Sequence, residues 1–150
     1  MFRTINDRLM VSPQIGVEQV ATAKSLGVGL IVNNRPEDES ADQTPGATIA
    51  AAAAQAGIAY VAIPVGHSGF SLNQVDALDA ALKQAGDAPV LAYCRSGTRS
   101  TLLWALTMAR GGMAPARIAQ AAADAGYDVS PLQAQIDILA AGHAGNAAKP

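Results

Sequence analysis

One short stretch constrains the fold of this chain more than any other part of the sequence. Residues 89–93 form an apolar run that favours a buried β-strand, and residues 102–108 form an apolar run compatible with a helix. Between them, residues 94–100 read Cys-Arg-Ser-Gly-Thr-Arg-Ser. The pattern predicts a strand, a tight loop and a helix start, and such a loop places several unpaired backbone N–H groups around one point.

The composition of this loop predicts an anion site beside a nucleophile. Gly97 can take backbone angles that other residues resist, so the loop can curve around an anion, and Arg99 can donate two parallel hydrogen bonds to its oxygens. The helix dipole adds partial positive charge, which stabilises a thiolate and makes Cys94 the predicted nucleophile. A structural, buried Cys94 is the weaker alternative. The residues predicted to bind the substrate anion with Arg99 are Arg95, Ser96, Gly97, Thr98 and Ser100.

Strands and helices alternate along the chain, and this predicts an α/β fold with a parallel sheet of about four strands and helices on both faces. Strands are predicted at residues 8–11, 28–32, 58–63 and 89–93. Helices are predicted at residues 16–26, 47–56, 71–85, from the Cys94 loop to 110, and at 115–125 and 131–141. The last two helices are expected to cover the core, and a role at the substrate edge is the weaker alternative. We expect one domain over residues 1–141 and a flexible C-terminal tail over residues 142–150.

Composition argues against several classes of function. The net charge is −2, so nothing electrostatic supports binding to nucleic acid. No apolar run is long enough to span a membrane and the N-terminus lacks the form of a signal peptide, so we expect a cytoplasmic protein with no membrane partner. A single cysteine excludes a disulfide within the chain, and one cysteine with two distant histidines makes no metal site. No cofactor is predicted.

Three loops are expected to meet at one edge of the sheet, because ligands of an open parallel sheet bind beyond the carboxyl ends of its strands. These loops are residues 33–39, 64–70 and 94–99. Arg35 can add a second positive charge to the anion site, or it can be a surface arginine beside two acidic neighbours. Asn34 can orient the Cys94 loop by hydrogen bonds, or it can simply form a turn.

His67 is the candidate general acid or base, because a histidine titrates near neutral pH and this one lies on a loop that should face the site. A solvent-exposed histidine without a role is an equal alternative. The loop that holds it, residues 66–70, contains no Asp or Glu. The other histidine, His143, falls in the predicted tail and is expected to be inert.

The motif Cys94-Arg-Ser-Gly-Thr-Arg99 resembles the active-site loop of rhodanese-type sulfurtransferases. It also resembles, one residue short, the Cys-x5-Arg loop of protein tyrosine and dual-specificity phosphatases. A bacterial family with a phosphatase-like fold, which includes the phosphatase-like domain of beta-lactamase-hydrolase-like proteins, is similar over roughly residues 1–110, and its members are often labelled sulfur transferases. The matching stretches are residues 31–36, 60–65, 90–100 and 103–104. The resemblance implies a fold like that of tyrosine and dual-specificity phosphatases, here with extra C-terminal helices.

Two details of the resemblance point in different directions. Four residues lie between Cys94 and Arg99, as in rhodanese loops, whereas the phosphatases have five. Phosphatases of this type also use a proton donor, usually an Asp on a mobile loop, and the matching loop at residues 66–70 has none. The implied fold therefore points to a phosphatase, and the loop length points to sulfur transfer.

We expect a cysteine-thiolate enzyme and favour a rhodanese-type sulfurtransferase that works through a Cys94 persulfide. Its partners would be a small anionic sulfur donor, such as thiosulfate or a persulfide, and an external thiol acceptor. The alternative is a phosphatase that forms a phosphocysteine from a phosphorylated substrate, with His67 as the acid and Ser100 or Thr101 assisting release of the thiolate. A non-catalytic anion-binding or redox-sensing module is a minor third alternative.

Overall fold

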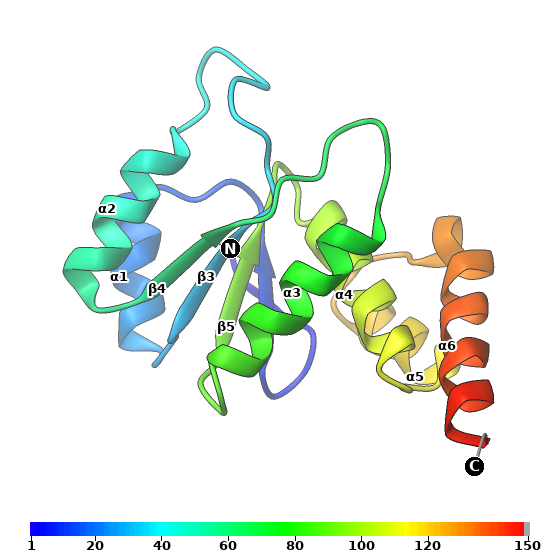
Figure 1. Cartoon of the computed structure of the whole chain (residues 1–150). Coiled ribbons are helices and arrows are strands. Elements are labelled where there is room, and N and C mark those ends of the chain that lie inside the picture. The colour runs from blue at the N-terminus through cyan, green and yellow to red at the C-terminus, as the bar shows by residue number, and fades with distance from the viewer. Residues whose placement is uncertain (149–150) are drawn as a thin grey trace.

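The computed structural model describes residues 1–148 of the chain, with side chains through residue 144. A five-stranded sheet lies at the centre (Figure 1), in the order β1-β2-β5-β3-β4. Its strands are β1 (Arg3–Thr4), β2 (Leu9–Ser12), β3 (Leu30–Asn33), β4 (Ala59–Ala62) and β5 (Val90–Tyr93). Strands β2 to β5 pair in parallel, and β1 is antiparallel to β2. The predicted α/β class and its four parallel strands are confirmed, and β1 is too short for a sequence pattern to indicate.

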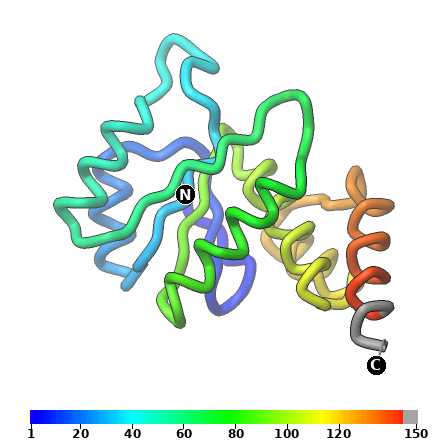
Figure 2. The backbone as a smooth tube through the Cα atoms, viewed as in Figure 1, coloured from blue at the N-terminus to red at the C-terminus, as the bar shows by residue number. Residues whose placement is uncertain are grey.

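Helices cover both faces of this sheet. They are α1 (Val17–Ser25), α2 (Gly46–Ala56), α3 (Leu72–Gln84), α4 (Thr98–Arg110), α5 (Pro115–Asp124) and α6 (Gln133–Ala148), with a short 3-10 helix, η1 (Ser130–Leu132), before α6. Helices α1 and α2 pack on one face, and α3 and α4 pack on the other (Figure 1). The backbone tube in Figure 2 shows α5 and α6 beyond α4, so the C-terminal helices extend the molecule on one side only.

The central strand β5 divides the core into two halves. All four of its residues are buried, and they alternate: Val90 and Ala92 pack toward α3 and α4, whereas Leu91 and Tyr93 pack toward α1 and α2. A parallel strand with helices on both faces needs apolar residues at every position, which explains the continuous apolar run in the sequence. Trp104 of α4 is buried in the larger half, next to the C-terminal helices.

Local signals set the helix ends near the site. The Ser71 hydroxyl accepts the N–H of Gln74 at 3.3 Å, while Gln74 Oε1 accepts the N–H of Ser71 at 2.8 Å; this is the predicted capping box of α3. Gly97 precedes α4 with a φ of 94°, in the left-handed region that favours glycine.

The C-terminal segment departs from its predicted form. Helix α6 continues to Ala148, so the segment predicted as a flexible tail begins as helix, and residues 149–150 lie outside the described residues. Within the part of the chain that the structure describes, no helix combines the length and apolar character needed to cross a membrane.

Candidate active site

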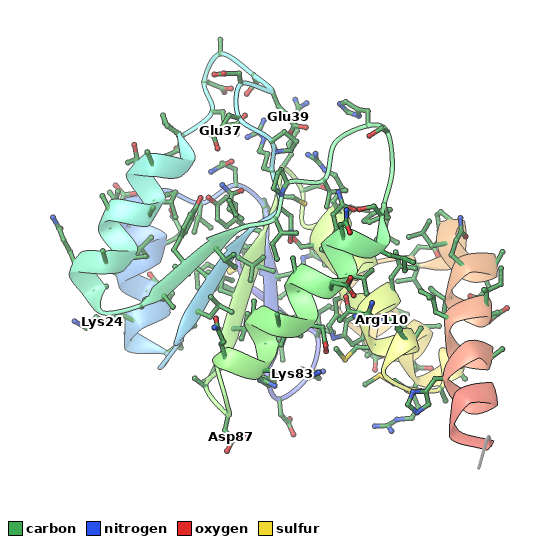
Figure 3. The ribbon with its side chains drawn as sticks, in the orientation of Figure 1. Lys24, Glu37, Glu39, Lys83, Asp87 and Arg110 are labelled. Atoms are coloured by element: carbon green, nitrogen blue, oxygen red, sulfur yellow. The ribbon has the colours of Figure 1, made fainter. Side chains whose placement is uncertain are left out.

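Three loops meet beyond the carboxyl ends of β3, β4 and β5, as the sequence predicts. Arg99, at the start of α4, joins all three, because it bonds both Glu39 on the loop after β3 and the Val65 carbonyl on the loop after β4. Figure 3 shows Glu37 and Glu39 at this edge of the molecule and Asp87 at the opposite edge. The site is therefore assembled from segments that are far apart in the sequence.

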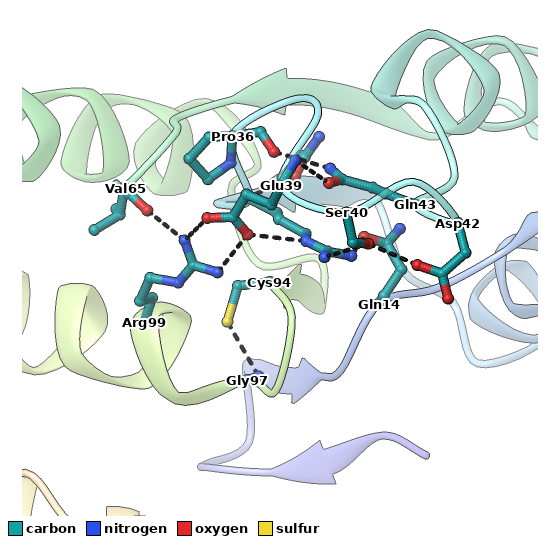
Figure 4. A network of polar contacts seen from close by, with 12 residues as sticks. Gln14, Pro36, Glu39, Ser40, Asp42, Gln43, Val65, Cys94, Gly97 and Arg99 are labelled. Carbon is teal, nitrogen blue, oxygen red and sulfur yellow. Dashed lines mark hydrogen bonds and ion pairs between the residues drawn. The ribbon is translucent and has the colours of Figure 1, made fainter. Parts of the chain in front are cut away.

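Cys94 is the first residue after β5, and its side chain is fully buried. Its N–H donates to the Ser12 carbonyl at 3.4 Å, which continues the pairing of β5 with β2. Its Sγ accepts the N–H of Gly97 at 3.0 Å (Figure 4). A backbone N–H and the positive end of the α4 dipole both favour negative charge on sulfur. The predicted nucleophile thus lies where a thiolate is supported.

Arg99 is fixed through both of its terminal nitrogens. Nη1 donates to Glu39 Oε2 at 2.7 Å and to the Val65 carbonyl at 2.6 Å, and Nη2 donates to Glu39 Oε1 at 2.8 Å. A guanidinium has five N–H groups. The two that donate to no protein oxygen among the described residues, Nε–H and the second Nη2–H, lie side by side on one edge, and the Cys94 sulfur is close enough to interact with this guanidinium. That edge can hold two oxygens of an anion in bidentate geometry.

Glu39 is the carboxylate that holds this guanidinium. The hydrogen bonds from Arg99, assisted by Arg35 and opposed by burial, lower the pKa of Glu39 from 4.5 to about 2. The carboxyl is only 12% exposed and is therefore largely shielded from bulk water. Because Glu39 stays ionised at neutral pH, it cannot donate a proton to a leaving group.

Arg35 is buried and is not a surface arginine, so that alternative from the sequence is wrong. Its guanidinium donates to Glu39 Oε1 at 2.9 Å, to Gln14 Oε1 at 3.0 Å and to Ser40 Oγ at 3.2 Å. The sequence suggested a surface position beside acidic neighbours, but the loop turns the Arg35 side chain inward, where it meets Glu39. Arg35 places a second positive charge beside Arg99, and this charge is paired with the Glu39 carboxylate. Whether it also contacts substrate stays a prediction.

Asn34 links the loop after β3 to the start of α4. Its Oδ1 accepts the Ser100 hydroxyl at 2.8 Å, and its Nδ2 donates to the Ile63 carbonyl at 2.9 Å. Both Asn34 and Ser100 are buried. Asn34 was predicted to orient the Cys94 loop by hydrogen bonds, and these are the contacts that such a role requires. The Ser100 hydroxyl gives its proton to Asn34, so any donation from Ser100 to an anion falls to its backbone N–H in the first turn of α4.

Comparison with known proteins identifies the family. The model of a family described as the phosphatase-like domain of beta-lactamase hydrolase-like proteins matches residues 1–111. The chain belongs to this family. A beta-lactamase hydrolase-like protein of Xylella fastidiosa (strain Temecula1) is 33% identical over 103 residues, which cover 69% of this chain and 24% of the relative. The phosphatase-like domain therefore spans about a quarter of the length of the curated relatives that it matches.

Solved structures share the fold of this phosphatase-like domain. A candidate phosphatase of Neisseria meningitidis Z2491 superposes with a TM-score of 0.80 at 31% identity, over 91% of this chain and 96% of that chain. A cysteine-to-serine variant of P. aeruginosa TpbA, solved in complex with phosphotyrosine, superposes with a TM-score of 0.66 over 95% of this chain and 90% of that chain. Its identity is 18%, so it supports the fold alone.

The other residues predicted for the site have varied surroundings. Arg95 is exposed, and its carbonyl accepts the N–H of Gln14 at 3.3 Å. The Ser96 and Thr98 hydroxyls bond each other at 3.0 Å at the open side of the loop. The Thr101 hydroxyl donates to the Gly97 carbonyl at 2.9 Å, so it is committed to α4 and not to the Cys94 sulfur.

The two histidines differ in position. His67 is exposed on the loop after β4, as both alternatives for it allow. His143 lies on α6 and packs against Gly112 in the turn between α4 and α5, where a Cβ on the glycine would come within 2.6 Å of its Nε2. It thus belongs to the C-terminal helices that pack beside α4.

Two residues of the site were missed from the sequence, Glu39 and Tyr127. Glu39 lies in a loop that was expected to reach the site, but three acidic residues follow one another there and nothing local separates them. Tyr127 follows α5, and its hydroxyl donates to the Ser96 carbonyl of the Cys94 loop at 3.1 Å. It lies beyond the family match, between the two last helices, for which a role at the substrate edge was the weaker of the two expectations.

Proposed function

We propose that this phosphatase-like domain hydrolyses phosphate monoesters through a phosphocysteine on Cys94. The observation that carries the proposal is the pairing of two groups: a buried sulfur that accepts the Gly97 N–H, and a fixed Arg99 with one bidentate edge open to an anion. The match to a candidate phosphatase at a TM-score of 0.80 supports phosphate over other anions. From the sequence alone, a phosphatase was the alternative to a sulfurtransferase. The family match and the solved structures now give the phosphatase the stronger support.

In the first step, the Cys94 thiolate attacks phosphorus and forms an S–P bond while the P–O bond to the leaving group breaks. The open edge of Arg99 binds two non-bridging oxygens, and the N–H groups at the start of α4 bind the remaining charge. Because these donors are already fixed around the transferring phosphoryl group, they need not reorganise during the reaction, and this lowers the barrier. Glu39 contributes by holding Arg99 in place.

The leaving oxygen departs with an electron pair and needs a proton from the enzyme or from water. Glu39 is ionised and cannot supply it, and the exposed His67 is the candidate donor on the loop after β4. Aryl phosphates need less help than alkyl phosphates, because a phenolate is a more stable anion than an alkoxide. We therefore expect a preference for aryl phosphates.

In the second step, water attacks the phosphocysteine, the S–P bond breaks and phosphate leaves after the water has lost a proton. Cys94 departs as a thiolate and regains the N–H of Gly97, which is 3.0 Å from sulfur. The Thr101 hydroxyl, which bonds the Gly97 carbonyl, supports the loop and not the sulfur itself. No metal or cofactor enters either step.

Sulfur transfer, the function first favoured from the sequence, stays the second candidate because of one observation. Only four residues separate Cys94 from Arg99, which gives a smaller loop than the phosphatases have. In that reaction the thiolate attacks the outer sulfur of thiosulfate, the S–S bond breaks and sulfite leaves with the electron pair. Cyanide or a thiol then removes the sulfur from the Cys94 persulfide. The family and the structural relatives lend it no support.

The test compares the parent chain with Cys94→Ser in two assays, p-nitrophenyl phosphate hydrolysis and thiocyanate formation from thiosulfate and cyanide. We expect phosphate release that falls by at least about a thousandfold in the variant, without thiocyanate. Cys94-dependent thiocyanate without phosphate release would establish sulfur transfer instead. If neither product forms while Cys94→Ser still binds phosphate, the site is a non-catalytic anion site.

A further inference from the structure

One peptide group in the Cys94 loop is held at both of its ends. Its carbonyl, from Ser96, accepts the Tyr127 hydroxyl at 3.1 Å, and its N–H, from Gly97, donates to Cys94 Sγ at 3.0 Å. A peptide group is planar, so the direction of its C=O fixes the direction of its N–H. A hydrogen bond to the carbonyl also polarises the group and strengthens the bond that the N–H donates.

Tyr127 is firmly placed for this contact. Its N–H donates to the Ala122 carbonyl at 2.9 Å, and the Arg3 guanidinium lies over its ring at 5.5 Å from the centroid. Arg3 also donates to the Ala125 carbonyl at 2.9 Å, which ties strand β1 to the same turn. Burial, with the nearby Cys94 adding to it and Arg3 opposing it, raises the pKa of Tyr127. The phenol therefore stays protonated and able to donate at neutral pH.

The fit of Tyr127 on the loop is close. A Cβ added to Gly97 would lie 2.2 Å from Tyr127 Oη, and the φ of Gly97 is 94°. A side chain at this position would therefore displace the phenol as well as strain the backbone. The glycine serves two purposes, since it lets the loop turn and lets the hydroxyl reach the carbonyl of the preceding residue.

We propose that Tyr127 is a positioning residue of the active site: by donating to the Ser96 carbonyl, it aims the Gly97 N–H at the Cys94 sulfur and stabilises the thiolate. The inference deepens the proposed function and rests on Cys94 as its nucleophile. Among the described residues the Tyr127 hydroxyl bonds the Ser96 carbonyl and not the sulfur, so it acts through the peptide group. The C-terminal segment beyond the family match thereby contributes to the chemistry of the phosphatase-like domain.

The other charges around Cys94 do not depend on this tyrosine. They are Arg95, the next residue in the loop, and Arg99 on α4, with Glu39 and Arg35 on the loop after β3, while β2 contributes only a backbone carbonyl. The hydrogen bonds that hold Arg99, Glu39 and Arg35 within the described part of the chain do not involve Tyr127. Removing the phenolic oxygen should therefore change the Gly97 N–H and leave the ion pairs in place.

The test follows the rate of Cys94 alkylation by iodoacetamide against pH in the parent chain, Tyr127→Phe and the control Ser130→Ala. Ser130 lies in the same segment, and among the described residues its hydroxyl bonds only Asp128, two positions earlier. We expect the midpoint of alkylation to move up by about half to one pH unit in Tyr127→Phe, which is the effect of losing one hydrogen bond. Ser130→Ala should keep the parent midpoint.

An unchanged midpoint in a folded Tyr127→Phe protein would overturn the proposal. If that variant folds poorly, the NMR resonance of the Gly97 amide in the parent chain decides instead. This resonance should shift as Cys94 ionises. A Gly97 amide resonance that stays constant through the titration would overturn the proposal. Alkylation and amide shifts need no substrate. A failure here is therefore distinguishable from a failure of the phosphatase assay, which leaves these readouts unaffected.

Discussion

Arg99 holds its position through two terminal nitrogens, and a lysine cannot reproduce that arrangement because it carries a single point charge. In Arg99→Lys the ammonium can pair with Glu39 or with a bound phosphate, but it cannot present a planar edge to one while holding the other. We expect kcat/KM for an aryl phosphate to fall about a hundredfold or more. The matched control is Arg110→Lys at the far end of α4, where Arg110 pairs with Asp76 on the surface. Equal activity of both variants would show that the bidentate edge is not used.

Glu39 gives a prediction that depends on pH. Because its pKa is lowered to about 2 in the folded chain, its contribution to stability is complete above pH 4.5 and is lost as the pH falls through about 2. Glu39→Gln should lower the free energy of unfolding at pH 7 by about 2 kcal/mol, since it leaves two arginines without their carboxylate. The difference from the parent should shrink between pH 4.5 and 2 in urea unfolding experiments.

The control for this experiment is Glu18→Gln on the exposed face of α1, which should change stability by less than about 0.5 kcal/mol. A difference between Glu39→Gln and the parent that stays constant down to about pH 2 would contradict the argument. It would mean that the shape of the side chain matters and its charge does not.

The residues of the site differ in how far sequence could predict them. Cys94 and Arg99 lie in one loop between a strand and a helix, so the order of residues in that loop is enough to predict their chemistry. Glu39 is 60 positions away from Arg99, and its neighbours show why it could not be singled out: Glu37 accepts the Gly46 N–H at the start of α2, and Asp38 takes a φ of 61°. Only the path of the loop decides which of the three acids reaches Arg99.

The loop after β3 is coupled to helix α4 and to strand β4 by a buried pair of hydrogen bonds. Asn34 accepts from Ser100 at the start of α4 and donates to the Ile63 carbonyl at the end of β4. Removing either side chain leaves a buried polar group unpaired, which costs about 1–3 kcal/mol. We expect Asn34→Ala and Ser100→Ala each to destabilise the chain in urea unfolding, and their double variant to lose about 1 kcal/mol less than the sum. Strict additivity would show that the pair is not coupled.

The elements themselves followed closely from the sequence, and for physical reasons. Apolar runs predicted the parallel strands, because a strand covered on both faces has no polar side. The capping box at Ser71 and the glycine at 97 marked helix starts by local hydrogen bonding and backbone freedom. The length of α6 was underestimated, because glycines at 142 and 145 indicate a helix end, yet the helix continues past both to Ala148. Tyr127 reaches the Cys94 loop only through the packing of α5, which local patterns cannot show.

The last prediction concerns the molecule as a whole, because the family match ends at residue 111 and the described fold does not. Helix α6 packs against α4, and its Ile136 is fully buried in the same cluster as Trp104. Ile138, two positions along the same helix, is 70% exposed and provides a control of identical chemistry.

Ile136→Ala should lower the free energy of unfolding by about 2–4 kcal/mol, the usual loss for emptying a buried isoleucine site, and Ile138→Ala should change it by less than about 0.5 kcal/mol. The unfolding transition of the Ile136 variant should stay single, because a shared core makes the C-terminal helices melt with the sheet. Two separate transitions, or equal effects of the two substitutions, would show instead that α6 is an appendage. In that case Tyr127 would have to be held on the Cys94 loop by Arg3 and α5 alone.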